Sequence, residues 1–266
     1  MRATPYPHWP EYLIEAVCLA AFMVSAAAFA TVLQHPASPL AGVVPTPGMS
    51  RVLMGVAMGL TLVAIVQSPW GQRSGAHMNP AVTLTFLRLG RIEPVDAASY
   101  IAAQFAGGAA GIAVATVLLA RLPAHASVNY VATVPGPAGA AVAFAAEAAI
   151  SFALMLTVLA VSNHPRLGRL TGIFAGLLVA LFIVFESPLS GTSMNPARSA
   201  GPAVLARTLD SLWIYFSAPT LGMWLAADVF VRRCGRTGVR CAKLVHPVGG
   251  RCIFRCGHAA PVQEVL

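Results

Sequence analysis

Charged side chains are scarce in this chain of 266 residues, where Asp, Glu, Lys and Arg together make up only 10% of the sequence. A soluble globular domain usually carries about 25%. Hydrophobic residues account for 57%, and the mean hydropathy is +0.73. The lack of charge excludes an ordinary soluble domain and predicts that lipid surrounds most of the chain.

Acidic residues are scarcer than basic ones: the chain has 9 Asp and Glu against 17 Lys and Arg, and its formal net charge is +8. Seven of the basic residues lie in the last 35 positions: Arg232, Arg233, Arg236, Arg240, Lys243, Arg251 and Arg255. A basic tail directly after an apolar segment is typical of the cytoplasmic side of a membrane protein. The sequence lacks a basic stripe with interleaved aromatic residues, so nucleic acid is not expected as a partner.

Sequence motifs of catalysis are also lacking. There is no nucleophile elbow, no His-Glu-x-x-His pattern and no phosphate-binding loop. The sequence therefore does not indicate an enzyme, and no cofactor is expected.

Cysteine is rare outside the last 33 residues, which we call the tail (234–266). Only Cys18 lies elsewhere, in the first apolar segment. The tail reads Cys234-x6-Cys241-x4-His246-x5-Cys252-x3-Cys256-x-His258. Such a density of Cys and His is one way to hold a structural zinc ion, with Cys241, His246, Cys252 and Cys256 as candidate ligands. Because the spacing matches no common zinc finger, the favoured interpretation is free thiols on a basic segment at the membrane surface, without a metal.

Six apolar segments have about the length that a membrane crossing requires, which is roughly 20 residues. They run over residues 12–33, 51–68, 95–120, 138–161, 170–186 and 212–231. With both termini inside, the inner loops and tail hold thirteen basic residues, whereas the outer loops hold Arg51, Arg121 and Arg207. This asymmetry predicts a multi-pass protein of the cell membrane, plasma or inner, with both termini in the cytoplasm.

One nine-residue motif occurs twice. Residues 74–82 read Ser-Gly-Ala-His-Met-Asn-Pro-Ala-Val, and residues 190–198 read Ser-Gly-Thr-Ser-Met-Asn-Pro-Ala-Arg, with six identical positions at an offset of 116. A pair of glycines, Gly55 and Gly59, has a counterpart at an offset of 117, and Glu15 in the first apolar segment has Glu147 in the fourth. The chain is therefore two related halves, about 1–122 and 138–232. Since each half has three spans, the halves must insert with opposite topology.

The Asn-Pro pair of each motif predicts the start of a helix. Asn is a preferred N-cap, and Pro is favoured at the first helical position. The helix over 80–88 would rise about 13 Å, nearly half of a hydrocarbon core of about 30 Å. Each Asn oxygen would cap its own half-helix, and each amide NH2 would then point into a lumen as a donor. The predicted fold is an all-α membrane protein with six transmembrane helices and two re-entrant half-helices in an inverted repeat.

With these two motifs, the chain resembles the major intrinsic protein family, the aquaporins and glycerol facilitators, and in particular a bacterial-type aquaporin. The resemblance covers about residues 10–232, so we expect a channel domain over 1–233 and leave the tail outside it. It implies a homotetramer with one pore per subunit, a passive channel for water and small neutral solutes. A glycerol or urea facilitator and an ion-coupled secondary transporter are the alternatives.

The resemblance also implies which residues line the pore. The two family motifs are Asn79, Pro80 and Ala81, and Asn195, Pro196 and Ala197. Arg198, Thr192 and Ile183 match positions of the selectivity filter. The fourth filter position is Met58 if the segment before the first motif is one residue longer than usual, and Gly59 if it is not. Ser199-Ala200 and Tyr215-Phe216 resemble water channels more than glycerol facilitators.

Several other polar residues lie near these motifs. Glu15 and Glu147 are expected to accept hydrogen bonds from the re-entrant loops, or else to lie at a helix end near the membrane interface. His77 is expected to be a hydrogen-bonded structural residue, with a pH-dependent gate as the alternative. Glu186 and Asp210 are expected to be solvated near the outer mouth.

Overall fold

The computed structural model describes residues 8–43, 46–247 and 251–258, and this part of the chain contains helices, turns and loops without a strand. Six helices are long and apolar enough to cross a membrane. They are α1 (Trp9–Gln34), α2 (Pro47–Gln67), α5 (Pro94–Leu118), α6 (Ala140–Ser162), α7 (Thr171–Phe185) and α10 (Leu212–Cys234). The span of α7 includes the 3-10 turn before it and covers Gly168–Phe185. All six predicted spans are therefore confirmed as helices.

Four shorter helices lie between the spans. α3 (Pro69–Ser74) precedes α4 (Pro80–Arg88), and α8 (Ser187–Ser190) precedes α9 (Pro196–Ala206). Single 3-10 turns, η1 (Leu122–Ala124), η2 (Asn129–Val131), η3 (Gly168–Leu170) and η4 (Arg236–Gly238), complete the described helices. The half-helices predicted after the two Asn-Pro pairs are α4 and α9.

Proline sets many of the helix starts. α2, α3, α4, α5 and α9 each begin at a Pro, whose missing N–H costs nothing in the first turn. Side chains of Thr46, Ser68, Asn79 and Asn195 accept hydrogen bonds from the first turns of α2, α3, α4 and α9. These caps fix where each helix begins, including the two short helices at membrane depth.

The two halves pack as a pseudo-symmetric pair. α1 packs on α5 in the first half as α6 packs on α10 in the second, and α2 crosses α7 between the halves. At that crossing a Cβ added to Gly59 would lie 2.6 Å from the carbonyl oxygen of Gly176, and a Cβ added to Gly176 would lie 2.6 Å from that of Gly59. Only glycine lets the two backbones approach this closely.

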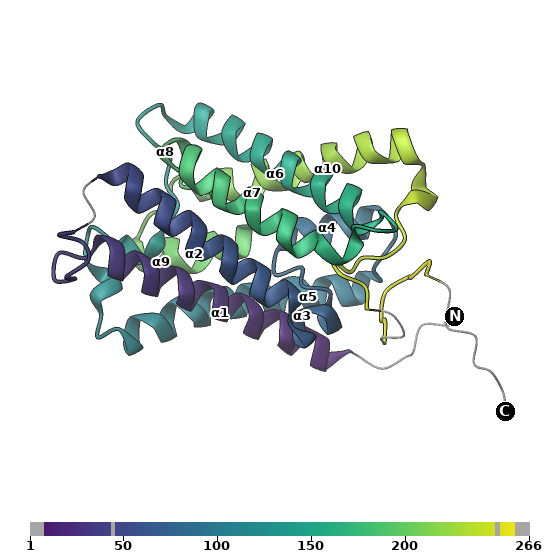
Figure 1. Cartoon of the computed structure of the whole chain (residues 1–266), viewed down its shortest axis with the longest axis horizontal. Helices are drawn as coiled ribbons and strands as arrows, with labels where there is room; N and C mark the ends of the chain where they lie inside the picture. The colour runs from purple at the N-terminus through teal and green to yellow at the C-terminus, as the bar shows by residue number, and fades with distance from the viewer. Residues whose placement is uncertain (1–7, 44–45, 248–250, 259–266) are drawn as a thin grey trace.

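The two ends of the helical bundle differ in which segments of the chain they hold (Figure 1). α1 begins and α10 ends at one end, which we call the tail end, and the α1–α2 connection lies at the opposite end. Large apolar side chains are exposed along the sides of the bundle, among them Leu13, Val56, Leu60, Val117, Leu177, Phe185, Leu221 and Leu225. Such a surface suits lipid rather than water.

The described part of the tail folds back against the bundle. Buried side chains of the tail are Val239, Cys241, Ala242, Lys243, Leu244, Val245 and Phe254. All of them except Lys243 join the same hydrophobic core as α1, α4 and α5. This packing differs from the membrane-surface segment expected from the sequence, because it places the middle of the tail inside the bundle.

Candidate functional site

The two asparagines of the repeated motif cap the half-helices. Asn79 Oδ1 accepts a hydrogen bond from Ala81 N at 2.9 Å, and Asn195 Oδ1 accepts from Ala197 N at 3.0 Å and Arg198 N at 3.2 Å. The tips of α4 and α9 are in contact with each other. The N-terminal ends of two helix dipoles, each carrying a positive partial charge, therefore meet in the middle of the protein.

The same two side chains also bond across the repeat. Asn79 Nδ2 donates to Met194 O at 2.7 Å, and Asn195 Nδ2 donates to Met78 O at 2.7 Å. Met78 and Met194 have φ of 47° and 53°, a left-handed conformation that turns these carbonyls toward the opposite loop. Since an amide nitrogen has two N–H groups, each Asn keeps one further donor. The sequence predicted the caps, whereas this reciprocal pair depends on the meeting of loops 116 residues apart.

Two buried carboxylates hold the loops that precede the half-helices. Glu15 accepts from Ser74 Oγ at 2.7 Å, from the backbone N–H of residues 77 and 78 at 3.1 and 2.6 Å, and from Gln104 Nε2 at 2.9 Å. Glu147 accepts from Ser190 Oγ at 2.7 Å and from the backbone N–H of residues 193 and 194 at 2.6 and 2.7 Å. Each carboxylate therefore satisfies N–H groups that a non-helical loop would otherwise leave unpaired at membrane depth.

Three residues support the loops in a way that the sequence did not predict. Tyr100 donates its hydroxyl proton to Ser74 O at 2.7 Å, and Tyr215 donates to Ser190 O at 2.6 Å. These tyrosines are 115 residues apart, close to the repeat offset, so a search for further pairs would have found them. Glu186 was expected in solvent, yet it is buried; it accepts a hydrogen bond from Thr192 Oγ1, and the hydroxyl of Ser190 lies between it and Glu147. That expectation was wrong because the returning loop covers this helix end; Asp210 is exposed, as expected.

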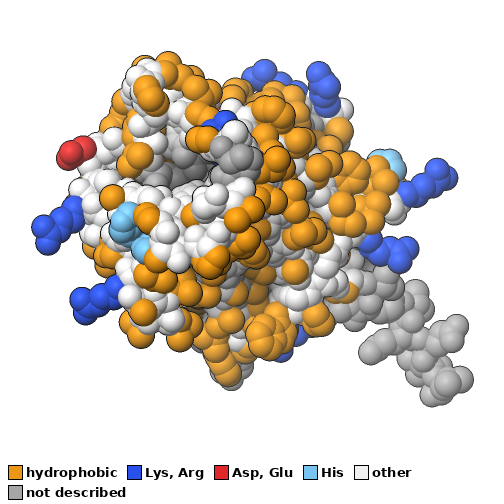
Figure 2. All heavy atoms as spheres, turned by 60° about the vertical axis from the view of Figure 1, so that its left-hand side comes forward, with side chains coloured by type: hydrophobic (Ala, Val, Ile, Leu, Met, Phe, Trp, Pro, Cys, Tyr) orange, Lys and Arg blue, Asp and Glu red, His pale blue; other side chains and the backbone are white. Residues whose placement is uncertain are grey.

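A cavity of about 370 Å³ runs along the bundle past the two asparagines. Figure 2 shows a hollow at the end of the molecule opposite the tail. The cavity is lined mainly by apolar side chains of α1, α2, α6 and α7, together with the 127–132 segment, which the sequence analysis did not single out. The residues expected at the filter, Met58, Ile183, Thr192 and Arg198, all line it.

The structure distinguishes between the two candidates on α2. Met58 is buried and lines the cavity, whereas Gly59 lies in the close contact of α2 with α7. The residue facing the cavity at this level is therefore the methionine. Its sulfur lies 4.0 Å from Ser25 Oγ on α1.

Arg198 supplies a buried donor without a partner at the cavity wall. Its Nη1 is buried and has no hydrogen-bond partner among the residues that the structure describes. Burying a guanidinium N–H without a partner costs about 1–3 kcal/mol or more. A donor that lines a cavity in this state suits a small polar guest.

The tail contributes to the wall of the cavity. Leu244 is among the lining residues, together with Leu62, Val158 and Ala175 from α2, α6 and α7, and it is 6% exposed. His77 connects the tail to the first motif: its Nδ1 lies 3.0 Å from Thr83 Oγ1 and its Nε2 lies 2.8 Å from the carbonyl oxygen of residue 242. These bonds fit the structural histidine expected from the sequence.

Six apolar spans around a cavity that passes between two re-entrant half-helices define a multi-pass membrane protein with an internal cavity. The chain matches the family described as Major intrinsic protein over residues 6–230 and belongs to it.

Relatives in this family include plant proteins. The chain is 38% identical over 183 residues to "Aquaporin NIP1-3" of Oryza sativa subsp. japonica, covering 68% of this chain and 60% of the relative. It is 37% identical over 177 residues to "Probable aquaporin NIP-type" of Nicotiana alata, covering 66% and 63%. The chain thus spans about three fifths of the length of these relatives. They give no support to the bacterial-type part of the resemblance.

A solved structure shows the same fold. The X-ray structure of the aquaglyceroporin from Plasmodium falciparum superposes with a TM-score of 0.70, covering 87% of this chain and 99% of that one at 18% identity. At this identity the likeness concerns the fold alone, and it supports the inverted arrangement of six spans and two half-helices.

Proposed function

We propose that residues 1–233 form a passive channel for water and small neutral solutes. The observation that carries this proposal is the cavity itself, which passes the two asparagines that cap the half-helices and the unpaired Nη1 of Arg198. The two asparagine amides orient a passing solute by its oxygen, and the helix dipoles behind them oppose cations and protons. Family membership supports a channel rather than an enzyme.

The chemistry of the cavity wall favours water together with small uncharged solutes. Arg198 and the loop carbonyls are polar, whereas Met58 and Ile183 are apolar and offer no N–H or O–H donor. A wall of this kind suits a molecule with a carbon backbone and hydroxyl or amide groups, so glycerol and urea are expected to pass beside water. The Ser199-Ala200 and Tyr215-Phe216 sequences favour a channel that conducts mainly water over a dedicated glycerol or urea facilitator.

An ion-coupled transporter is disfavoured by the surroundings of the intramembrane carboxylates. Such a transporter needs a carboxylate that can exchange an ion near the midplane. Glu15 and Glu147 are fully buried and are occupied by hydrogen bonds from the re-entrant loops. Their arrangement supports a fixed loop rather than a coupling site.

We further infer the orientation and assembly. The tail end carries most of the basic residues, so we place it, with both termini, in the cytoplasm, and place the protein in the plasma or inner membrane. The apolar sides of the bundle suit a homotetramer in lipid with one pore per subunit. Nucleic acid is not part of this proposal.

The experiment is osmotic flow across proteoliposomes measured by stopped flow, with water, glycerol and urea side by side. The unmodified chain is compared with Leu244→Ala, which shortens the side chain of the tail that lines the cavity. We expect water flow through the protein to be faster than in empty liposomes, without saturation and independent of ion gradients. Saturating or ion-dependent flux would indicate the transporter instead.

A further inference from the structure

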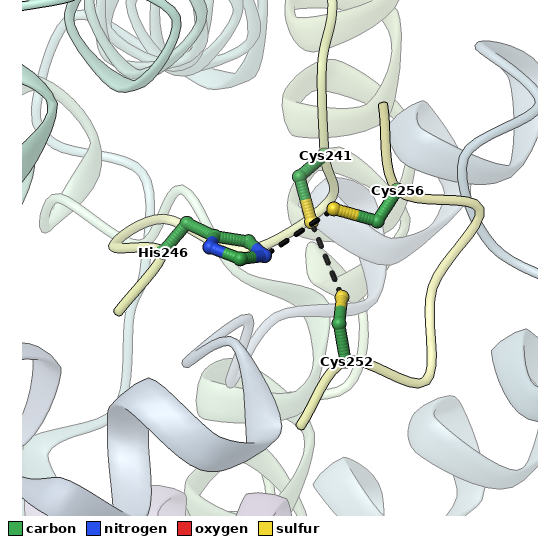
Figure 3. Close-up of side chains that lie close together, drawn as sticks. All are labelled: Cys241, His246, Cys252 and Cys256. Carbon is green, nitrogen blue, oxygen red and sulfur yellow. Dashed lines mark hydrogen bonds between the residues drawn. The ribbon is translucent and has the colours of Figure 1, made fainter. Parts of the chain in front are cut away.

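The candidate ligands of the tail converge in the structure. One ligand atom from each of Cys241, His246, Cys252 and Cys256 lies within 4.8 Å of all the others. The shortest separations are 3.5 Å between the sulfurs of Cys241 and Cys252 and 3.2 Å from Cys256 Sγ to His246 Nε2. Figure 3 shows the three sulfurs and the ring nitrogen pointing toward one another.

We propose that these four side chains, the zinc cluster, bind one Zn²⁺ ion, and that the ion fixes the tail over the tail end of the cavity. Zn–S bonds of about 2.3 Å in a tetrahedral site place two sulfurs about 3.8 Å apart. The sulfurs of Cys241 and Cys252, 3.5 Å apart, lie close to this value, and all four ligand atoms lie within 4.8 Å of one another, so small side-chain movements suffice to bind the ion. Three Cys and one His are a ligand set of closed, structural zinc sites, which leave no open position for catalysis.

The charges around the zinc cluster suit a bound thiolate site. Three thiolates and one Zn²⁺ leave one net negative charge. The cation closest in sequence is Lys243, whose side chain is 2% exposed and whose Nζ donates to the carbonyl oxygen of Arg251 at 2.7 Å. A lysine this buried normally needs anionic neighbours, and those of Lys243 are Glu11 and the thiolates of the zinc cluster.

Outer contacts orient two of the ligands. The backbone N–H of residue 243 donates to Cys241 Sγ at 3.5 Å, and the ring of His258 stacks on that of His246 with centroids 4.4 Å apart. Partners of this kind position the ligands of structural metal sites. A disulfide between Cys241 and Cys252 fits less well, because the sulfurs are 3.5 Å apart and the tail faces a reducing compartment in the proposed orientation.

The zinc cluster is tied to the cavity through Leu244. This residue lies between the ligands 241 and 246, and its backbone N–H donates to the carbonyl oxygen of Gly75 at 3.1 Å, just before the first motif. Phe254, between the ligands 252 and 256, stacks on His77 with ring centroids 5.5 Å apart. The tail segment between η4 and residue 258 has no helix or strand in its described part, so a metal cross-link is what fixes this irregular segment.

More contacts attach the tail at its edges. Arg240 N donates to Asn163 Oδ1 at 2.7 Å, and Arg255 forms a two-bond pair with Glu93 at 2.6 and 2.7 Å, which lowers the pKa of the Glu93 carboxyl. These contacts hold the rim of the tail, whereas the zinc cluster fixes its centre. Loss of the ion is expected to free Leu244 from the cavity and raise permeability. This last step rests on the proposed channel function.

The metal is tested first, on the full chain purified with a tag free of histidine and without chelators. Elemental analysis should find one zinc per chain, and replacement of zinc by Co²⁺ should give the absorption of a tetrahedral thiolate site. Cys252→Ser and Cys256→Ser should lose the metal, whereas Cys234→Ser, an exposed cysteine outside the zinc cluster, should keep it. A chain free of zinc that takes up none when reloaded, or a Cys241–Cys252 disulfide found by mass spectrometry, overturns the proposal.

Coupling to the cavity is tested on the same unmodified chain, which avoids variants that fail to fold. Removing zinc with a chelator should increase both protease cleavage within the tail and water flow, and added zinc should reverse both. Unchanged cleavage after complete zinc removal overturns the role of the ion in fixing the tail. If cleavage rises and flow is unchanged while Leu244→Ala conducts, the closure is overturned. If neither form conducts, the channel function itself fails, and zinc binding is judged by the metal content alone.

Discussion

At the tips of α4 and α9, each asparagine side chain caps a helix with its oxygen and bonds the opposite loop with its nitrogen. Replacing Asn79 with Asp keeps the cap acceptor but sets a carboxylate oxygen against Met194 O. The loss of this buried hydrogen bond should cost about 1–3 kcal/mol of stability. We expect a several-fold loss of water flow or a new cation leak, measured in proteoliposomes.

Asn163→Asp is the matched control, because it also loses an amide bond, from Nδ2 to Leu159 O, but at the end of α6 outside the cavity. Its oxygen still accepts from Arg240 N, so the tail keeps this contact. It should leave water flow unchanged. Normal flow and normal ion exclusion in both Asn79→Asp and Asn195→Asp would contradict the assigned role of the motif.

Selectivity is decided by the side chains that face Arg198. Ile183→His adds a polar ring to the apolar side of the cavity and narrows it, so glycerol and urea flow should fall several-fold while much of the water flow remains. Ile183→Val, which stays apolar and is smaller, should not reduce solute flow. If the unmodified or Leu244→Ala chain passes water but excludes glycerol, urea and other small neutral solutes, the assignment of Met58 and Ile183 to the filter is wrong.

Local chemistry explains which residues could be predicted. The caps at Asn79 and Asn195 follow from neighbouring residues, and the carboxylates of Glu15 and Glu147 follow from the repeat. The position of Glu186 could not be predicted, since its burial depends on a loop that returns over a helix end. The cross-loop bonds of the two asparagines likewise depend on tertiary contact.

Among the helices, α2 and α7 make the closest contact between the two halves. Gly59→Ala places a methyl carbon 2.6 Å from the carbonyl oxygen of Gly176, so the helices must move apart. Overpacking of this kind costs about 1–3 kcal/mol, and the midpoint of thermal unfolding in detergent should fall. Gly42→Ala is the control, since its nearest neighbour is 3.9 Å away and its unfolding temperature should not fall. Equal unfolding temperatures for the two variants would contradict the tight crossing.

Long elements could be predicted better than short ones. Hydropathy places the spans within a few residues; the fourth, expected over 138–161, runs over Ala140–Ser162. The half-helix expected over 80–88 is α4, because Asn and Pro fix its start. The helices α3 and α8, of 6 and 4 residues, are too short to show a hydrophobic period. The buried path of the tail has no period at all and could not be predicted.

At the scale of the whole molecule, the inverted repeat brings two loop motifs from opposite ends to one point. The cavity wall at this level and the cross-loop bonds of the two asparagines depend on that meeting. The tail adds a part outside the repeat, and it reaches the same cavity through Leu244. The arrangement predicts a channel whose conduction depends on both the repeat and the state of the tail.

The most direct test is the temperature dependence of osmotic water flow in proteoliposomes that contain the zinc-free full chain, with proton flux recorded in parallel. We predict water flow faster than in empty liposomes, with a low activation energy and without proton conduction. The account would be contradicted if the zinc-free chain and the Leu244→Ala chain, both well incorporated, gave the same water flow as empty liposomes.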